Sequence, residues 1–173
     1  MTLASAGELL GACERSAVHL ELRDGYSRAD PLFQRWQAGQ LDDSVDQDPW
    51  LRPWLDLVAE ATRRGVTVRR ARVVSEPVSE YIRYEHAITF ANVDAGEDIR
   101  WLPRRQASRL LLPGNDFWVF DDRLVLWNHF TGEGERSPGG HEADDDPESV
   151  KVCAAAFDAV WERTVPHGEY QPA

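Results

Sequence analysis

An arginine cluster near the middle of the chain holds the residue types best suited to ligand binding. Arg70 and Arg72 end an apolar run, and their spacing places both side chains on one face of a strand. In open α/β sheets, ligands bind beyond the carboxyl ends of strands, beside the amino ends of helices. The two guanidinium groups, with the amides near Pro77, could therefore hold an anion. The simpler alternative is a solvated surface on which the arginines pair with nearby carboxylates, namely Glu76, Glu80 and Glu85.

Two neighbouring segments could extend this anion site. On the helix that follows the strand, Glu80, Arg83 and Tyr84 could join the arginines. A second basic patch comes after a short strand, where Trp101 and Arg104 precede further arginines, and it could bind phosphate or an acidic partner. A solvated loop or 3₁₀ segment is the simpler explanation of this second patch.

Common catalytic motifs are not found in the sequence. There is no G-x-S-x-G, no Walker loop and no G-x-G-x-x-G. Cys13 and Cys153 each lie on an apolar helical face, so we expect core thiols in a reducing compartment rather than nucleophiles or a disulfide. Asp116 and Asp121 could form a carboxylate pair, although Asp121 is better explained as a turn residue. No catalytic residue is therefore predicted.

Metal or cofactor binding is not predicted either. The five histidines lack metal-ligand spacing, and no cysteine stands near to complete a zinc site. His141 and the acidic run that follows it could attract a cation, but a flexible acidic loop over residues 132–147 is the better explanation.

Composition limits the classes of partner. The 173 residues carry a net charge of −11, which disfavours direct binding of nucleic acid and suits a basic protein partner. The amino terminus lacks the basic and apolar segments of a signal peptide, and no run is long enough to cross a membrane. We therefore expect a cytoplasmic protein.

Hydrophobic periodicity predicts alternating helices and strands. A strand, a helix and a second strand within residues 66–102 form a βαβ unit, which predicts a parallel pair. Residues 116–130 follow as a hairpin that turns at Asp121 and Asp122. The remaining predictions are helices over residues 4–15, 30–39, 50–64 and 148–163, and a half-buried strand over residues 18–22.

Much of the chain resembles an actinobacterial family of unknown function. The resemblance rests on five segments: HLELRDGY (19–26), RRARVVSEPVSEYIRY (69–84), WLPRR (101–105), PGNDFWVFD (113–121) and VWERTVPHGEY (160–170). Members of this family often accompany helix-turn-helix regulators with small acidic partner proteins. The resemblance implies a regulatory role and identifies no chemistry.

A second resemblance covers residues 66–165, where the order of elements is similar to one half of a phospholipase D-type fold. Active members carry His-x-Lys-x₄-Asp on the first hairpin strand and an Asn on the second. If Asp121 takes the Asp place, Gly114 and Asp116 occupy the His and Lys places, and Asn128 keeps the Asn. Glycine has no nucleophile and aspartate reverses the required charge, so the resemblance implies a non-catalytic domain, like sensor or dimerisation modules of transcription factors.

These inferences predict an α/β protein with a mixed sheet and flanking helices. Residues 66–173 would form the phospholipase D-like half domain and residues 1–65 a mostly helical extension, unless both form one compact unit. The function expected is that of a non-catalytic regulatory or accessory protein that binds a helix-turn-helix regulator, a small anionic ligand, or both. Two alternatives stay open: a homodimer that completes a two-lobed arrangement, and an enzyme acting on an anionic substrate. The enzyme would use Arg70, Arg72, Glu80, Tyr84 and Asp116.

Overall fold

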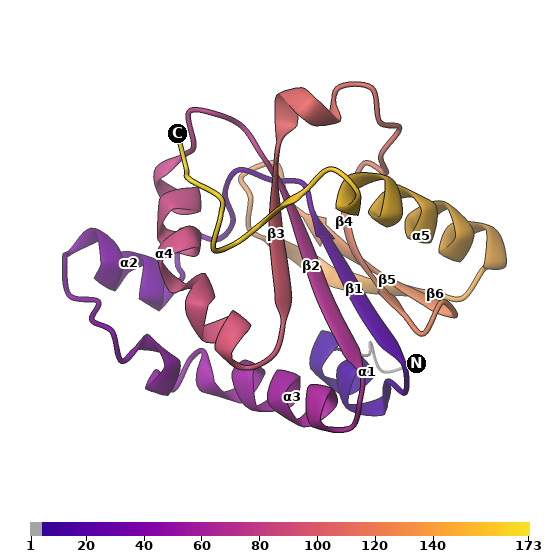
Figure 1. Ribbon diagram of the computed structural model, residues 1–173, viewed down its shortest axis with the longest axis horizontal. Coiled ribbons are helices and arrows are strands. Elements are labelled where there is room, and N and C mark those ends of the chain that lie inside the picture. Colours follow the sequence, from indigo (N-terminus) through magenta and orange to yellow (C-terminus); the bar gives the residue numbers. More distant parts are fainter. Residues whose placement is uncertain (1–4) are drawn as a thin grey trace.

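A mixed sheet, seven-stranded within the described residues 5–173 of this computed structural model, forms the centre of the molecule (Figure 1). Its strands are β1 (Ser16–Glu21), β2 (Thr67–Val74), β3 (Asp98–Pro103), β4 (Asp116–Phe120), β5 (Leu124–Phe130), β6 (Arg136–Asp144) and β7 (Val165–Pro166). The α-helices are α1 (Ala6–Ala12), α2 (Pro31–Gln37), α3 (Arg52–Arg63), α4 (Glu80–Asp94) and α5 (Pro147–Trp161). Two short 3₁₀ helices cover Val45–Gln47 and Arg104–Ala107.

The strand order is β6-β5-β4-β1-β2-β3-β7. β1, β2 and β3 are mutually parallel, whereas the other neighbouring strands are antiparallel. The parallel pair predicted from the βαβ pattern is confirmed as β2 and β3, joined through α4. The α/β class with a mixed sheet and flanking helices is also confirmed.

Helices cover both faces of the sheet. α5 packs on one face, where Leu20, Val73 and Phe157 belong to the same buried cluster. α1 and α3 pack on the opposite face, where Leu10 and Val58 contact strand side chains. Figure 1 shows α5 apart from α1, α3 and α4 across the sheet. β1 is therefore a central strand that is buried on both faces, and the predicted half-buried strand is wrong in this respect.

The amino-terminal part of the chain is built into this sheet. β1 is hydrogen-bonded to β2 on one side and to β4 on the other. A mostly helical extension separate from the sheet therefore does not describe residues 5–65, because their strand supplies the centre of the layer. Residues 1–4 lie outside the described residues. They include the start of the helix expected over residues 4–15, and they belong to the amino terminus in which no signal peptide was expected.

The carboxyl-terminal hairpin follows its prediction, and the segment after it does not. Asp121 and Asp122 both adopt positive φ, 53° and 55°, as a tight turn between β4 and β5 requires. The acidic loop expected over residues 132–147 is wrong, because β6 runs through most of it and pairs with β5. An edge strand bonds to one neighbour only and needs little apolar surface, so its composition resembles that of a loop. Within residues 5–173, no helix has the length and apolar character needed to cross a membrane.

Candidate functional site

A cavity of about 560 Å³ opens on the sheet face that α3 and α4 cover. Its floor comes from four adjacent strands and is polar: His19, Glu21, Arg70, Arg72, Asp116 and Asn128. Its walls are largely aromatic: Tyr26, Trp54, Tyr81, Tyr84, Trp118 and Phe130. A volume of this size is typical of sites for small organic molecules.

Strand alternation explains why the floor is polar. Ala17 and Val68 lie on the face covered by α1 and α3, and they belong to the apolar cluster there. His19 and Glu21 continue the parity of Ala17, and Arg70 continues that of Val68, so these side chains point to the same face. The sheet face is therefore apolar beneath the helices and polar towards the carboxyl ends of β1 and β2.

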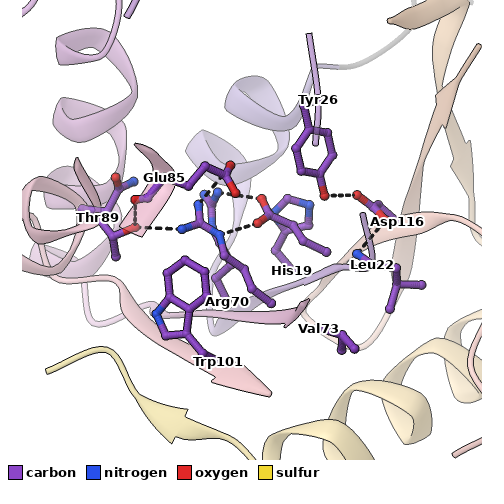
Figure 2. Close-up of polar contacts among 12 residues, drawn as sticks. His19, Leu22, Tyr26, Arg70, Val73, Glu85, Thr89, Trp101 and Asp116 are labelled. Atoms are coloured by element: carbon purple, nitrogen blue, oxygen red, sulfur yellow. Dashed lines mark hydrogen bonds and ion pairs between the residues drawn. The ribbon is translucent and has the colours of Figure 1, made fainter. Parts of the chain in front are cut away.

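The arginines of the floor are held by buried carboxylates. Nε of Arg72 donates to Oε2 of Glu21 at 2.5 Å, and its Nη1 donates to Oγ1 of Thr89 at 2.7 Å. Arg70 donates to Oε1 of Glu21 at 2.9 Å and to Oε1 of Glu97 at 2.7 Å. Figure 2 shows Glu85 and Thr89 of α4 facing the strand residues of this network. Both guanidinium groups are thus neutralised inside the protein.

This network corrects the expected anion site. Of the ion pairs expected in the simpler alternative, the one between Arg72 and Glu85 does form, but it is buried rather than solvated. Glu21 and Glu97 pair with the arginines in place of Glu76 and Glu80. The amides near Pro77 are not free either, since α4 begins at Glu80 and the amide of Val78 donates to the carbonyl of Ala173. Burial decides the outcome, because a desolvated guanidinium requires a carboxylate partner.

Glu21 is ionised, whereas Glu85 titrates near neutral pH. Burial alone would raise the pKa of Glu21, but Arg72 and Arg70 outweigh burial and lower this pKa to about 2. Burial raises the pKa of Glu85 to about 7, and Arg72 offsets it only in part. The reason is distance: Nη2 of Arg72 lies 3.6 Å from Oε1 of Glu85, beyond a good hydrogen bond.

Asp116 is the second carboxylate of the site with a raised pKa. Burial raises its pKa to about 6, while hydrogen bonds from Tyr26 and Leu22 oppose the change. The hydroxyl of Tyr26 donates to Oδ2 at 2.5 Å and the amide of Leu22 donates to Oδ1 at 2.9 Å. Figure 2 shows both contacts. Asp116 therefore fixes the loop after β1 above the floor.

Unsatisfied polar atoms gather around the cavity. In the part of the chain that the structure describes, five buried side-chain atoms make no hydrogen bond within the protein. Four of them belong to residues that line the cavity: His19 Nδ1, Trp54 Nε1, Glu85 Oε2 and Asn128 Oδ1. The fifth, Nε of Arg69, lies on the α5 face, where the guanidinium stacks over Phe157. Since buried polar atoms are normally satisfied, the cavity offers contacts for a ligand.

The structure brings together five of the nine candidate site residues. Arg70, Arg72, Tyr84, Asp116 and Asn128 all line the cavity. Asp116 and Asn128 are register partners on β4 and β5, and Nδ2 of Asn128 lies 3.3 Å from Nε2 of His19.

The other four candidates lie outside the cavity. Glu80 and Arg83 are exposed on the outer side of α4, because Tyr84 and Glu85 occupy its inner face. Trp101 is fully buried beside the floor on β3, with the guanidinium of Arg72 at 4.9 Å from its ring centre.

Arg104 is also a structural residue. Its Nη2 donates to the carbonyls of Leu22 and Val73 at 2.7 and 2.9 Å, and it forms an ion pair with Asp24. It therefore ties the ends of β1 and β2 together and is not available to bind phosphate.

Several cavity residues were not among the site candidates named from the sequence, including His19, Glu21, Tyr26 and Glu85. His19 and Glu21 alternate with apolar residues, so they were assigned to a solvated face. The signal that could have found them is the pattern of β1 itself, where His19 and Glu21 follow Ala17 on one face of the strand. Among residues 5–173, no group of three or more His, Cys, Asp or Glu is placed to hold a metal ion.

Comparison with known proteins places this geometry in context. A family model described as "Domain of unknown function (DUF6879)" matches residues 4–172. No curated protein matches the chain. The fold is similar to that of Nuc from Salmonella typhimurium, a phospholipase D family member, with a TM-score of 0.53 at 10% identity over 92% of this chain and 86% of that one. NucT from Helicobacter pylori gives a TM-score of 0.52 at 12% identity, over 92% and 87%. The phospholipase D-like fold is thus confirmed, and the likeness extends well beyond residues 66–165.

Proposed function

The chain belongs to the DUF6879 family, whose description names no activity, and we propose that it is a non-catalytic regulatory protein that binds a small molecule in its cavity. One observation carries this proposal. Glu85 Oε2, Asn128 Oδ1 and Trp54 Nε1 are buried and unpartnered within the described residues, and all three side chains line one cavity with aromatic walls. A ligand that forms hydrogen bonds with these atoms would remove the free-energy cost of leaving them buried and unpaired.

The non-catalytic part of the proposal rests on the phospholipase D resemblance. The positions that correspond to the attacking His and the anion-stabilising Lys are Gly114 and Asp116. Asp116 is buried and carries an acidic group, which would repel a phosphodiester. Arg70 and Arg72 do not replace the missing lysine, because Glu21 and Glu97 already neutralise them.

The regulatory part rests on the resemblance to a family found beside helix-turn-helix regulators. We propose such a regulator as the partner, in an actinobacterial cytoplasm, and the net charge of −11 suits a basic partner surface. Ligand binding would be transmitted through the loop after β1 and through α4, since Tyr26 and Tyr84 line the cavity from these two elements.

A second candidate function is an enzyme of another type. The specific observation in its favour is that burial raises the pKa of Glu85 to about 7 and that of Asp116 to about 6, so both could transfer protons near neutral pH. An anionic substrate would have to displace Glu21 from Arg72, which makes this candidate the weaker one.

The proposal is tested by affinity capture from the cytoplasm of the source organism, with mass spectrometry of bound small molecules and proteins. Asn128→Leu removes one open acceptor from the cavity, and Asn115→Leu is the matched control at an exposed position. A compound retained by the wild type and the control but lost by Asn128→Leu supports binding in the cavity. Retention by all three, or by none, overturns it.

The same samples separate binding from turnover and test the partner. Unchanged mass of the captured compound after prolonged incubation supports a binding protein, whereas a product that forms only with active protein favours the enzyme. Recovery of a helix-turn-helix regulator supports the proposed partner, and its absence from the captured proteins removes that part of the proposal.

A further inference from the structure

Building on the proposed small-molecule site, we infer that the cavity selects a cationic amine with an aromatic body, rather than the anion that its arginines suggest. The first argument is the balance of buried charge. Two guanidinium groups, those of Arg70 and Arg72, share this region with four buried carboxylates: Glu21, Glu85, Glu97 and Asp116. An added ammonium group would offset the negative excess, and an added anion would increase it.

Both arginines are already paired with buried carboxylates. Arg70 uses Nε and Nη1 on Glu97 and Glu21, and Arg72 uses Nε and Nη1 on Glu21 and Thr89. An anion would therefore have to compete with buried carboxylates for the same guanidinium groups. His19 does not supply a cation either, because burial lowers its pKa to about 3 and leaves the ring neutral.

Two of the four open polar atoms, those on Glu85 and Asn128, are acceptors, and the other two are ring nitrogens of Trp54 and His19. Glu85 is 9% exposed and its Oε2 has no partner within residues 5–173, while Oδ1 of Asn128 is a second open acceptor. Nε1 of Trp54 is an open donor. An ammonium group has only donors, so it suits an open acceptor, and a hydrogen bond to Glu85 would be charge-assisted.

Aromatic rings lie beside Glu85. Tyr81 and Tyr84 lie one helical turn apart beside Glu85 on α4, with ring centres 5.4 Å apart, and Tyr26 lies 5.9 Å from Tyr81. The hydroxyls of Tyr81 and Tyr84 donate to Asp30, so the rings stay neutral. Ring faces attract cations and repel anions, and they also stack on an aromatic ligand body.

The rim carries charges of both signs and does not reverse this preference. Arg136 is exposed and its Nη1 lies 2.7 Å from Nε2 of His141, and Asp30 is a half-buried carboxylate that also lines the cavity. Screening by solvent weakens the field of Arg136, whereas Glu85 and Asp116 are buried. Selection is therefore set by the inner carboxylates.

Three indole probes of matched shape test the inference on the full chain: tryptamine is cationic, tryptophol is neutral and indole-acetate is anionic. Calorimetric titration at pH 8, where Glu85 is largely ionised, measures each affinity. We expect tryptamine to bind tightest, by about tenfold or more over the other two, with a Kd on the order of 1 mM or better. Equal or tighter binding of indole-acetate or tryptophol overturns the inference and leaves the cavity as a binding site. If none of the three probes binds, both the inference and the proposed small-molecule site are overturned.

Two variants locate the effect. Glu85→Gln keeps the shape of the side chain, so we expect it to weaken tryptamine about tenfold and leave tryptophol unchanged. Glu80→Gln, exposed on the same helix, is the matched control and should change neither affinity. If Glu85→Gln does not fold, Asn128→Asp provides the test, since a further carboxylate should strengthen tryptamine and weaken indole-acetate. Unchanged tryptamine affinity in either folded variant overturns the assignment.

Discussion

Glu21 and Arg72 are register partners on the parallel strands β1 and β2, and the guanidinium Nε donates to the carboxylate Oε2 at 2.5 Å. The two residues are 51 positions apart in the chain and both are more than nine-tenths buried. Because the same carboxylate also accepts from Arg70, Glu21 pairs with two neighbouring cations of one strand. Because of this pairing, Arg70 and Arg72 form part of the floor of a cavity and do not form an open anion site.

The first prediction concerns this floor. Arg72→Met should lower the free energy of unfolding by about 3–5 kcal/mol, because Glu85 would stay buried without its cation and Glu21 would keep only Arg70. Adding Glu21→Gln to that variant should recover part of the loss. Urea denaturation measures both changes. Arg52→Met, which breaks an exposed pair with Asp56, is the control and should cost less than about 1 kcal/mol. Equal losses in the two single variants would contradict a stabilising role for the network.

The second prediction concerns pH. Burial raises the pKa of Glu85 from its ordinary value of 4.5 to about 7, so between these pH values the unfolded chain releases a proton that the folded chain keeps. The stability that Glu85 contributes is therefore lost as pH rises through this window, by up to about 3 kcal/mol. Glu85→Gln lacks this titration, so its stability relative to wild type should increase from pH 4 to pH 8. Urea denaturation at both pH values measures the difference in free energy of unfolding between Glu85→Gln and wild type, with Glu80→Gln as the control at an exposed position. A difference that is the same at pH 4 and pH 8 would contradict the raised pKa.

The third prediction compares the two turn residues. Asp121 accepts hydrogen bonds from the amides of Glu14, Arg15 and Ser16 at 3.0, 2.7 and 3.0 Å, whereas Asp122 is exposed. Both have positive φ, so glycine suits the backbone at either position. Asp122→Gly should change the free energy of unfolding by less than about 1 kcal/mol. Asp121→Gly should lower it by about 2–4 kcal/mol, because three amides lose their acceptor.

The loss at Asp121 should also depend on pH. Burial opposes ionisation of Asp121, but the backbone amides outweigh it and hold the pKa well below its usual range. A depressed pKa contributes stability that is present above the unfolded pKa, near 4, and is lost as pH falls towards the folded value. The difference in free energy of unfolding between Asp121→Gly and wild type should therefore be smaller at pH 3 than at pH 7, as urea denaturation at both pH values would detect. A constant gap would argue against the role of the ionised carboxylate.

The fourth prediction concerns the thiols. Cys13 and Cys153 are both free and buried, and burial raises their pKa values to about 11 and about 12. A thiol with a raised pKa forms little thiolate and reacts slowly. Ellman's reagent should therefore detect almost no thiol in the native protein and both thiols in urea. Rapid reaction of either one in the native state would contradict its burial.

The sequence by itself predicted the elements whose patterns are local. The βαβ unit, the hairpin that turns at Asp121 and Asp122, and the last helix all appear close to their predicted ranges. Periodicity and turn chemistry are properties of neighbouring residues, so they can be read along the chain. β6 was missed because its glycines and proline resemble a loop, and only its pairing with β5 makes it a strand.

The tertiary structure decided which polar residues form a site. Arg70 and Arg72 were identified from their strand, but their partners Glu21 and Glu97 come from segments far away in the chain. His19 and Glu21 read as surface residues until β1 is placed between β2 and β4, where both faces are covered. Burial and pairing across strands set the charge of the cavity. Alternation along one strand cannot reveal them, because it gives the direction of a side chain and not what lies opposite.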